Sequence, residues 1–461
     1  MKALNLLAIA TVVLLASCGG QKQQNESGNP ILTVSGGQIQ GVVTDSTDVI
    51  VYKGIPYAAA PVGDLRWQKP QPVTPWEGVR TADTWGNVAI QAALDNGGGG
   101  GNFYVKEFYQ DGLPQSSEDC LYLNVWTPRS AAGNADSKLP VAMWIHGGAY
   151  DHGWGYEITM DGQEWAKRGV ILVTINYRVG IIGFLAHPEL SAEADGVSGN
   201  YGTLDQIAAL KWIRENISQF GGDPDNITIL GQSAGASSIK NLCLSPESKG
   251  LISRAIIQSG GGISGKRSDT GAEALKAYEE QGKNLMDSLG YTTLEQMRAI
   301  PASELLKIQQ GANMRFRPVT DGKYLPQTFD DATLDGNIAD VPYMIGYCAN
   351  DIGSMGESIK LFCETRNAQS KQPAYMYLFA RALPGDDAGA FHSSELWYTF
   401  HTLDRSWRPF TAADYKLADE MTDSWTNFAK YGNPNGQNGG SWTPCTKDNS
   451  YVQEFQVSEL E

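Results

Sequence analysis

The chain has 461 residues, of which 51 are Asp or Glu and 35 are Lys or Arg, giving a formal net charge of −16 at pH 7. This acidic balance disfavours nucleic acid as a partner, because binding a phosphate backbone requires a basic face. It also argues against acidic substrates drawn in by the overall field. A hydrophobic content of 41% with 10% aromatic residues is typical of a globular protein with a large core.

The first residues, MKALNLLAIATVVLLASC, predict export from the cytoplasm. One Lys precedes a short apolar run and small residues, a pattern typical of a secretory signal peptide and too short for a spanning helix. LASC resembles a bacterial lipobox, in which cleavage leaves the cysteine as a lipidated N-terminus. We therefore expect a signal peptide over 1–17, a lipidated Cys18, a flexible polar tether over 18–30 and one domain over 31–461. The expected location is the bacterial cell envelope, on the periplasmic or surface side of a membrane.

The remaining cysteines give no sign of a metal site. No C-x-x-C pattern and no Cys/His cluster appears, so thiolate coordination of a metal is not expected. Their odd number leaves at least one thiol unpaired in an exported chain, and the spacing does not choose the pairs. These cysteines are Cys120, Cys243, Cys348, Cys363 and Cys445.

Apolar runs alternate with helical patterns along the chain. The helical pattern over 203–217 has apolar residues at the spacing of one helix face, which predicts a helix packed on a sheet. The runs are nearly continuous, as expected for strands covered on both faces. This alternation predicts an α/β fold with a mainly parallel sheet and helices on both faces. The predicted strands cover 141–145, 170–177, 227–230, 254–259, 342–347 and 374–379.

WIHGGAY (144–150) follows the first of these strands and resembles the HGGG-type loop of esterases. Glycines let the backbone approach another group closely. Backbone N–H groups held in place beforehand stabilise the oxyanion that forms in acyl transfer. Gly148 and Ala149 are therefore candidate oxyanion donors, alongside Ala234.

GQSAG (231–235) directly follows the predicted strand ITIL and precedes the helix-compatible ASSIKNL. In this strand–turn–helix context, G-x-S-x-G is typical of a nucleophile elbow, whose sharp turn lifts the serine hydroxyl to the edge of the sheet. A side chain at Gly231 or Gly235 would clash in such a turn. Ser233 is therefore the candidate nucleophile. The Ala234 N–H at the start of the helix favours negative charge beside it.

A serine hydroxyl is a poor nucleophile without an adjacent base, and histidine is the usual base. In folds with a nucleophile elbow, the serine comes first in the chain, followed by the acid and then the histidine. Only two of the five histidines, His392 and His401, follow Ser233. His392 is favoured, because it lies in a loop, whereas His401 ends a helical stretch.

The acid is expected at a strand end between Ser233 and His392. Asp351 follows the predicted strand PYMIGY and is favoured, with Asp321 and Glu357 as alternatives. On residue type alone, the alternative for Asp351 is a solvated loop carboxylate.

Longer segments resemble the type B carboxylesterases, α/β-hydrolases of the cholinesterase–carboxylesterase–lipase family. FGGDPDNITILGQSAG (220–235) is similar to the family's serine signature, and EDCLYLNVWTP (118–128) to its second signature. YKGIPYAAAPVGDLRW (52–67) and FHSSELWYTF (391–400) match as well, so the resemblance covers nearly all of the mature chain.

This resemblance implies an α/β-hydrolase fold and a serine carboxylic-ester hydrolase that acts on a small-molecule ester without a metal or organic cofactor. It assigns Ser233 as nucleophile, His392 as base and Asp351 as acid. It assigns the oxyanion donors as Gly148, Ala149 and Ala234.

Several positions depart from the family pattern. Asp351 stands where Glu is common, Gln232 precedes the nucleophile where Glu is frequent, and Ala149 replaces a third glycine. Ala89 stands where the family has the disulfide partner of the cysteine in EDCLYLN. His392 follows Asp351 by only 41 positions, with room for one helix at about 357–367. A shortened lid side and a more open site are expected; the alternative is a gene product that folds poorly.

Aromatic residues in two segments are candidates for lining the substrate pocket, but they only weakly indicate which esters are preferred. Four aromatic residues precede EDCLYLN in a predicted loop that contributes to the alcohol-side pocket in relatives, although covering the core is the favoured interpretation. They are Phe103, Tyr104, Phe108 and Tyr109. Trp154 and Tyr156 are candidates for the acyl side. A non-catalytic binding or adhesion protein and an amide or peptide hydrolase remain alternative functions on the same fold. The sequence does not predict the oligomeric state.

Overall fold

A computed structural model describes residues 28–92, 101–268, 271–312 and 314–457. The predicted signal peptide, Cys18 and most of the predicted tether lie outside these residues. Asn29 is already buried, and its side-chain amide donates a hydrogen bond of 3.1 Å to the Gly41 carbonyl. The packed part of the chain therefore begins before the expected boundary at residue 31.

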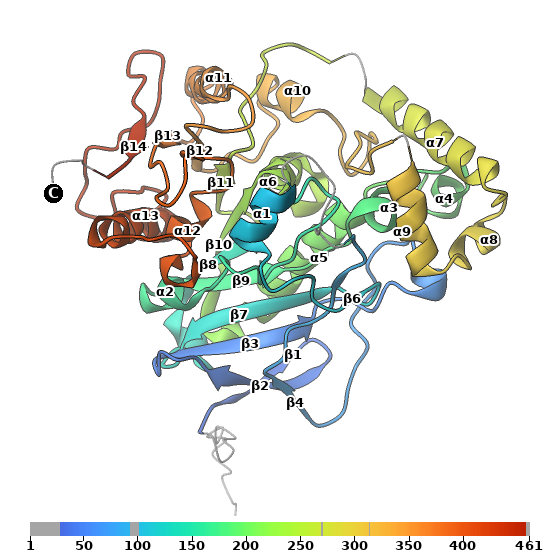
Figure 1. Ribbon diagram of the computed structural model, residues 1–461, viewed down its shortest axis with the longest axis horizontal. Helices are drawn as coiled ribbons and strands as arrows, with labels where there is room; N and C mark the ends of the chain where they lie inside the picture. The colour runs from blue at the N-terminus through green and yellow to red at the C-terminus, as the bar shows by residue number, and fades with distance from the viewer. Residues whose placement is uncertain (1–27, 93–100, 269–270, 313, 458–461) are drawn as a thin grey trace, which may run out of the picture.

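One 12-stranded sheet forms the centre of the molecule, in the order β1-β2-β3-β7-β9-β8-β10-β11-β12-β13-β14, with β4 paired to β2 (Figure 1). A second, two-stranded sheet joins β5 and β6. The strands are β1 Ile31–Val34, β2 Gly37–Val43, β3 Val49–Pro56, β4 Val79–Ala82, β5 Val88–Ala89, β6 Ser116–Ser117, β7 Tyr122–Pro128, β8 Leu139–Ile145, β9 Ile171–Ile175, β10 Gly222–Gln232, β11 Arg254–Gln258, β12 Tyr343–Cys348, β13 Ala374–Phe379 and β14 Gln453–Phe455.

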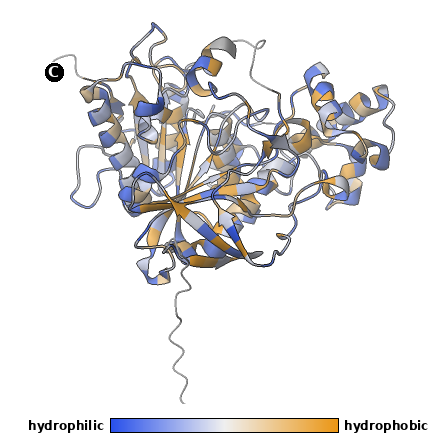
Figure 2. Cartoon of the chain, turned by 60° about the horizontal axis from the view of Figure 1, so that its bottom comes forward, coloured by the Kyte–Doolittle hydropathy of each residue, from blue (hydrophilic) through white to orange (hydrophobic). Residues whose placement is uncertain are grey.

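The sheet is parallel from β9 to β14 and antiparallel from β1 through β9, so the prediction of a mainly parallel sheet is confirmed. All six predicted strands are present as β8 to β13. Figure 2 shows orange segments on the central strands, whereas the peripheral helices carry both blue and orange segments. This distribution is expected for parallel strands that are buried on both faces.

The helices are α1 Gly101–Phe108, α2 Gln163–Lys167, α3 Gly180–Phe184, α4 Pro188–Glu193, α5 Tyr201–Asn216, α6 Ala234–Leu244, α7 Gly271–Ser288, α8 Leu294–Arg298, α9 Ala302–Gly311, α10 Phe329–Leu334, α11 Gly356–Ala368, α12 Leu396–Thr399 and α13 Ala412–Tyr431. The predicted helix over 203–217 corresponds to α5, and the one at about 357–367 to α11. The predicted loop before EDCLYLN is wrong in part, because α1 includes three of its four aromatic residues.

Alternate residues of the central strands enter two different cores, one on each face of the sheet. Along β8, Met143 and Ile145 belong to the core that α5 and α6 cover, whereas Ala142 and Trp144 belong to the core that α13 covers. This alternation follows from the period of two of a β-strand. The sheet is therefore sandwiched between helices, as the sequence predicts.

The parallel register brings the carboxyl ends of four strands to one edge of the sheet. Ile145 of β8 pairs with Gly231 of β10, Gln232 pairs with Gln258 of β11, and Gln258 pairs with Gly346 of β12. The loops that follow these strands contain the predicted oxyanion, nucleophile and acid residues. Crevices at the carboxyl ends of parallel strands are the usual ligand sites of open α/β sheets.

Candidate active site

Ser233 occupies a strained turn between β10 and α6. Its φ of 57° and ψ of −121° lie outside the regions that a side-chain-bearing residue normally adopts. The Ser233 N–H donates a hydrogen bond of 2.9 Å to the Gln258 carbonyl, which fixes the turn against β11. Strain of this kind persists where the surrounding structure enforces it, and it is concentrated at functional sites.

The glycines on either side of Ser233 are required by close backbone contact. A Cβ added to Gly231 would lie 2.6 Å from the Gly235 backbone carbon. A Cβ added to Gly235 would lie 2.1 Å from the Ile145 carbonyl oxygen. Both contacts involve backbone atoms, which cannot rotate away. Glycine therefore lets α6 begin directly against β8.

We expect Gly235→Ala to destabilise the protein by about 1–3 kcal/mol, the usual cost of overpacking a tight site, and to lower esterase activity. The added methyl group forces the start of α6 away from the end of β8. Urea unfolding and initial rates on p-nitrophenyl acetate measure the two effects. Gly311→Ala in α9 is the matched control, because no atom lies within 4 Å of its added Cβ. Equal stability of the two variants would contradict this account of the turn.

His392 and Asp351 lie together at the edge of the sheet. His392 Nδ1 lies 2.5 Å from Asp351 Oδ1, and their side chains are 9% and 1% exposed. The neighbouring residues fix this contact, because Asn350 and Phe391 form an isolated parallel β-bridge. The Asn350 N–H also donates to the Ala390 carbonyl at 2.9 Å.

The surroundings of Asp351 keep its carboxyl ionised. Burial alone would raise its pKa, but hydrogen bonds from His392 and from the Cys348 N–H outweigh burial and lower the pKa below its usual value. The Cys348 N–H contacts Oδ2 at 3.0 Å, and the Ile352 N–H contacts Oδ1 at 2.7 Å. An ionised carboxylate that accepts Nδ1–H leaves the other imidazole nitrogen, Nε2, as the proton acceptor.

Gln232 contacts that second nitrogen, with its Nε2 atom 3.2 Å from His392 Nε2. The amide donates when Nδ1 carries the imidazole proton. Among the described residues, Ser233 Oγ has no hydrogen bond to His392. The sequence places Gln232 directly before Ser233 but gives no sign of this contact, because it depends on a residue far away in the chain.

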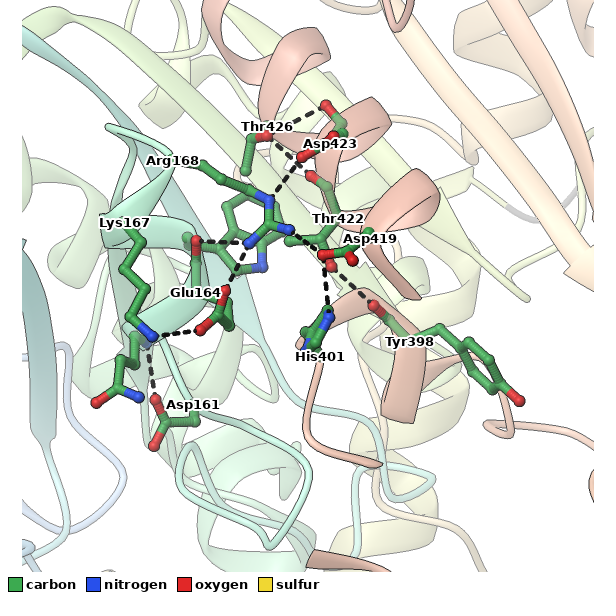
Figure 3. Close-up of polar contacts among 12 residues, drawn as sticks. Asp161, Glu164, Lys167, Arg168, Tyr398, His401, Asp419, Thr422, Asp423 and Thr426 are labelled. Atoms are coloured by element: carbon green, nitrogen blue, oxygen red, sulfur yellow. Dashed lines mark hydrogen bonds and ion pairs between the residues drawn. The ribbon is translucent and has the colours of Figure 1, made fainter. Parts of the chain in front are cut away.

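The alternative residues lie elsewhere. Figure 3 shows His401 beside α13, with its Nε2 3.2 Å from Asp419 Oδ1, in a cluster centred on Arg168. Asp321 is buried and accepts hydrogen bonds from the Asn200 side chain and from backbone N–H groups of its own turn. Glu357 is exposed at the start of α11. Of the three candidate acids, Asp351 is therefore the one in contact with a candidate histidine, His392.

The loop after β8 has three consecutive residues with positive φ: Gly148 at 97°, Ala149 at 54° and Tyr150 at 65°. The Gly148 carbonyl accepts hydrogen bonds from the N–H groups of Asp151 and His152, at 2.9 and 3.1 Å. In the described chain, the N–H groups of Gly148 and Ala149 donate to no protein acceptor. They remain available to an outside acceptor.

His146 contacts the start of this loop through its imidazole ring. Its ring is buried against Tyr177, with ring centroids 4.4 Å apart, and its Nδ1 lies 2.9 Å from the Gly147 carbonyl oxygen. Burial lowers the pKa of His146 to about 3, so the ring is neutral at physiological pH. Nδ1–H therefore donates to the loop. The sequence shows His146 as part of WIHGGAY but gives no sign of this contact.

A hollow of about 340 Å³ opens over Ser233, and its lining includes Ala149, Ala234 and His392. Gly148 lies next to this lining in the chain and is not part of it. The aromatic candidates do not line this hollow. Most of them border a separate hollow of about 770 Å³, namely Phe108, Tyr109, Trp154 and Tyr156. Phe103 stacks edge-on against Phe391, and the Tyr104 hydroxyl donates to the His392 carbonyl at 3.3 Å.

The expectation that Trp154 and Tyr156 border the acyl side is therefore not met, because their rings lie over a different hollow. The α1 aromatics were expected to cover the core, and this is confirmed for Phe108, which is buried in the core under α13.

All five cysteines within the described ranges are buried and form no disulfide. The described residues contain no cluster of His, Cys, Asp and Glu suited to a metal, and no helix among them is long and apolar enough to cross a membrane.

Comparison with known proteins gives the family. The sequence profile of the Carboxylesterase family matches residues 28–361 and 358–459. The chain is 33% identical to fumonisin B1 esterase of Sphingopyxis macrogoltabida, over 88% of this chain and 83% of that protein. It is 39% identical to para-nitrobenzyl esterase of Bacillus subtilis (strain 168), over 68% of this chain and 62% of that protein.

Solved structures agree with this result. A PNB esterase structure superimposes with a TM-score of 0.78 at 30% identity, covering 92% of this chain and 95% of the other. A carboxylesterase of Geobacillus stearothermophilus gives a TM-score of 0.77 at 31% identity, covering 93% and 96%. Similarity of this extent shows the α/β-hydrolase fold as well as the family. The chain therefore belongs to the carboxylesterase family and is a serine carboxylic-ester hydrolase.

Proposed function

We propose that Ser233 is the nucleophile, His392 the general base and Asp351 the residue that orients His392. The contact of 2.5 Å between His392 Nδ1 and Asp351 Oδ1 carries this proposal. Ser233 and His392 line the same hollow, which supports direct proton transfer between them. The strained Ser233 backbone supports the same role.

In the first half-reaction, the Ser233 hydroxyl attacks the ester carbonyl while His392 Nε2 removes its proton. Because the Gln232 amide contacts this nitrogen in the resting site, that contact must give way to Ser233 Oγ–H. The alcohol then leaves with the proton from His392, and an acyl-enzyme remains. Water hydrolyses the acyl-enzyme by the same route, and Asp351 stabilises the imidazolium in both halves.

We assign the oxyanion donors as the N–H groups of Gly148, Ala149 and Ala234. The unpaired N–H groups of Gly148 and Ala149 support this assignment, as does the position of Ala234 at the first turn of α6. Removing one such donor typically costs about 10²–10³-fold in kcat. Because these donors belong to the backbone, Ala149 can replace a glycine without losing the donor.

We also propose that the site is open because the segment between Asp351 and His392 is short. The family profile matches in two stretches that meet at residues 358–361, within this segment, which supports a deletion relative to the family. One helix, α11, lies between β12 and β13. Ile352, directly after Asp351, is 68% exposed on the rim of the hollow. Exposure of a large apolar residue there supports a site without a cover.

Cys18 is proposed as a lipid anchor, with residues 1–17 removed as a signal peptide and residues 18–30 as the linker to a domain over 31–461, against which the end of the linker packs through Asn29. The apolar run before Cys18 and the polar stretch after it support this arrangement. The enzyme would then reside in the bacterial cell envelope, on the periplasmic or surface side of a membrane. We expect Cys18→Ala to move the protein out of the membrane fraction. An unchanged distribution would contradict the anchor.

Ester hydrolysis is separable from the two alternative functions by one set of assays. The purified protein is tested on p-nitrophenyl acetate, p-nitrophenyl butyrate and the matched amide p-nitroacetanilide. We expect steady turnover of both esters and much slower turnover of the amide. Faster turnover of the amide would indicate an amide hydrolase. A folded protein without turnover of any substrate would indicate a binding protein.

A further inference from the structure

Two arginines line the hollow that contains Ser233. Arg315 and Arg317 lie on its wall, and the other ionisable side chains in the lining are His392 and Tyr150. Tyr150 is neutral, because burial raises its pKa to about 12. No carboxylate belongs to the lining. The described surface of this hollow therefore carries positive charge in a protein whose formal net charge is −16.

Both arginines come from the segment between α9 and α10, which is held to the rest of the fold on both sides of Arg317. Phe316 between them is buried, 1% exposed, whereas Arg315 and Arg317 are both exposed. Both arginines belong to the lining of the hollow, on either side of this buried residue in the chain. Asn200 anchors the segment by accepting from the Val319 N–H at 3.0 Å and donating to its carbonyl at 2.7 Å.

Neither guanidinium forms an ion pair with a carboxylate of the described residues. Arg317 Nε donates to the Tyr278 hydroxyl at 3.2 Å, which leaves its charge uncompensated. Other arginines of this chain pair closely with acids. Arg168, for example, contacts three carboxylates, those of Glu164, Asp419 and Asp423 (Figure 3). Arg80, Arg129 and Arg254 also form no ion pair among the described residues, but they lie outside the lining of the hollow that contains Ser233.

Asp151 is the acid that faces Arg315, and it compensates this charge only in part. Burial raises the pKa of Asp151 to about 6, while the positive charge of Arg315 opposes that rise. The two side chains form no ion pair. Two guanidinium groups against one carboxylate outside the lining leave the hollow positive. Surface charges are screened beyond about 8 Å at physiological salt, so an anion inside the hollow is governed by these arginines rather than by the distant acidic surface.

We propose that Arg315 and Arg317 bind a carboxylate of the substrate, so that the preferred substrates are esters carrying a free carboxylate on the acyl or the alcohol part. This proposal rests on Ser233 acting as the nucleophile. The planar guanidinium donates paired hydrogen bonds that match a carboxylate, and it stays charged at all working pH values.

The test uses matched ester pairs that differ only in this charge. For the alcohol side, the pair is 4-acetoxybenzoate and its methyl ester; for the acyl side, it is methyl hydrogen adipate and methyl hexanoate. Each kcat/KM is divided by the rate of hydroxide-catalysed hydrolysis of the same ester, which removes differences in intrinsic reactivity. We expect the anionic member of at least one pair to be preferred about tenfold, as expected for hydrogen bonds to charged groups. This preference should shrink as salt is added.

Arg315→Gln and Arg317→Gln are expected to reduce the ratio of anionic to neutral kcat/KM toward one, mainly by raising KM for the anion. Arg80→Gln in β4 removes the same charge from an exposed position outside the hollow and should keep the wild-type ratio. A wild-type ratio near one in both pairs, or an equal loss for both members in the arginine variants, would overturn the proposal. Activity toward the neutral esters that persists in Ser233→Ala would instead overturn the proposed nucleophile.

Discussion

Ser233→Ala is expected to lower kcat for p-nitrophenyl acetate by about 10⁴-fold or more, as in other triads. The alanine removes the atom that forms the acyl-enzyme and leaves the turn intact, because Ser233 Oγ holds no hydrogen bond within the described chain. Initial rates at saturating ester measure the loss. The remaining rate reflects binding and the oxyanion donors alone.

Ser237→Ala is a matched control for this variant. Ser237 follows one turn later on α6, and its side chain also borders the hollow. We expect this variant to lose far less activity than Ser233→Ala. An active Ser233→Ala protein, or a Ser237→Ala protein of equally low activity, would contradict the assignment of the nucleophile.

Asp351→Asn is expected to lower kcat by about 10⁴-fold, because the neutral amide no longer holds the imidazole in the tautomer that leaves Nε2 free. The substitution preserves the size of the side chain. An amide oxygen can still accept from the N–H groups of Cys348 and Ile352, so the fold should survive. Near-ultraviolet circular dichroism checks the fold, and the kcat of each variant is measured as a function of pH.

Glu357→Gln is the control for the acid, because Glu357 lies in the same segment and is exposed at the start of α11. This variant should keep near-full activity. If Glu357→Gln loses activity while Asp351→Asn keeps it, the acid is Glu357. Asp351→Glu is expected to retain part of the activity, since the carboxylate remains but its extra methylene disturbs a contact of 2.5 Å.

The parallel half of the sheet could be predicted from the sequence because its strands are continuous apolar runs. Strands such as β8 and β13 are buried on both faces, so their hydrophobicity does not alternate with surface polarity. The strands at the other end of the sheet lack this signal. In β4, for example, three of four residues are exposed. Such strands form through pairing with a neighbour, which local sequence does not encode.

The helix α1 was not predicted from the sequence, for a related reason. It follows a glycine-rich stretch, and glycine disfavours helix in isolation. Its aromatic residues are held by tertiary contacts, since Phe108 stacks near Trp397 with ring centroids 5.9 Å apart. A partner almost three hundred residues away cannot be deduced from local composition. Tertiary packing therefore outweighed local propensity.

The same limit applies to the site. Ser233, Asp351 and His392 could be named because motif, strand position and chain order each narrow the choice. Gln232 and the two arginines could not, because their relevance depends on contacts across the chain. Arg315 and Arg317 lie in a segment without a recognisable pattern, and only the fold brings them to Ser233.

The central claim is that catalysis passes through an acyl group on Ser233. Rapid quenching of the enzyme with p-nitrophenyl acetate in acid, followed by digestion and mass spectrometry of the peptides, tests it directly. We expect one acetyl group on the peptide containing GQSAG, located at Ser233 and formed during the initial burst of p-nitrophenol. Turnover with the acetyl group on another residue, or with no acetylated peptide at any quench time, would contradict it.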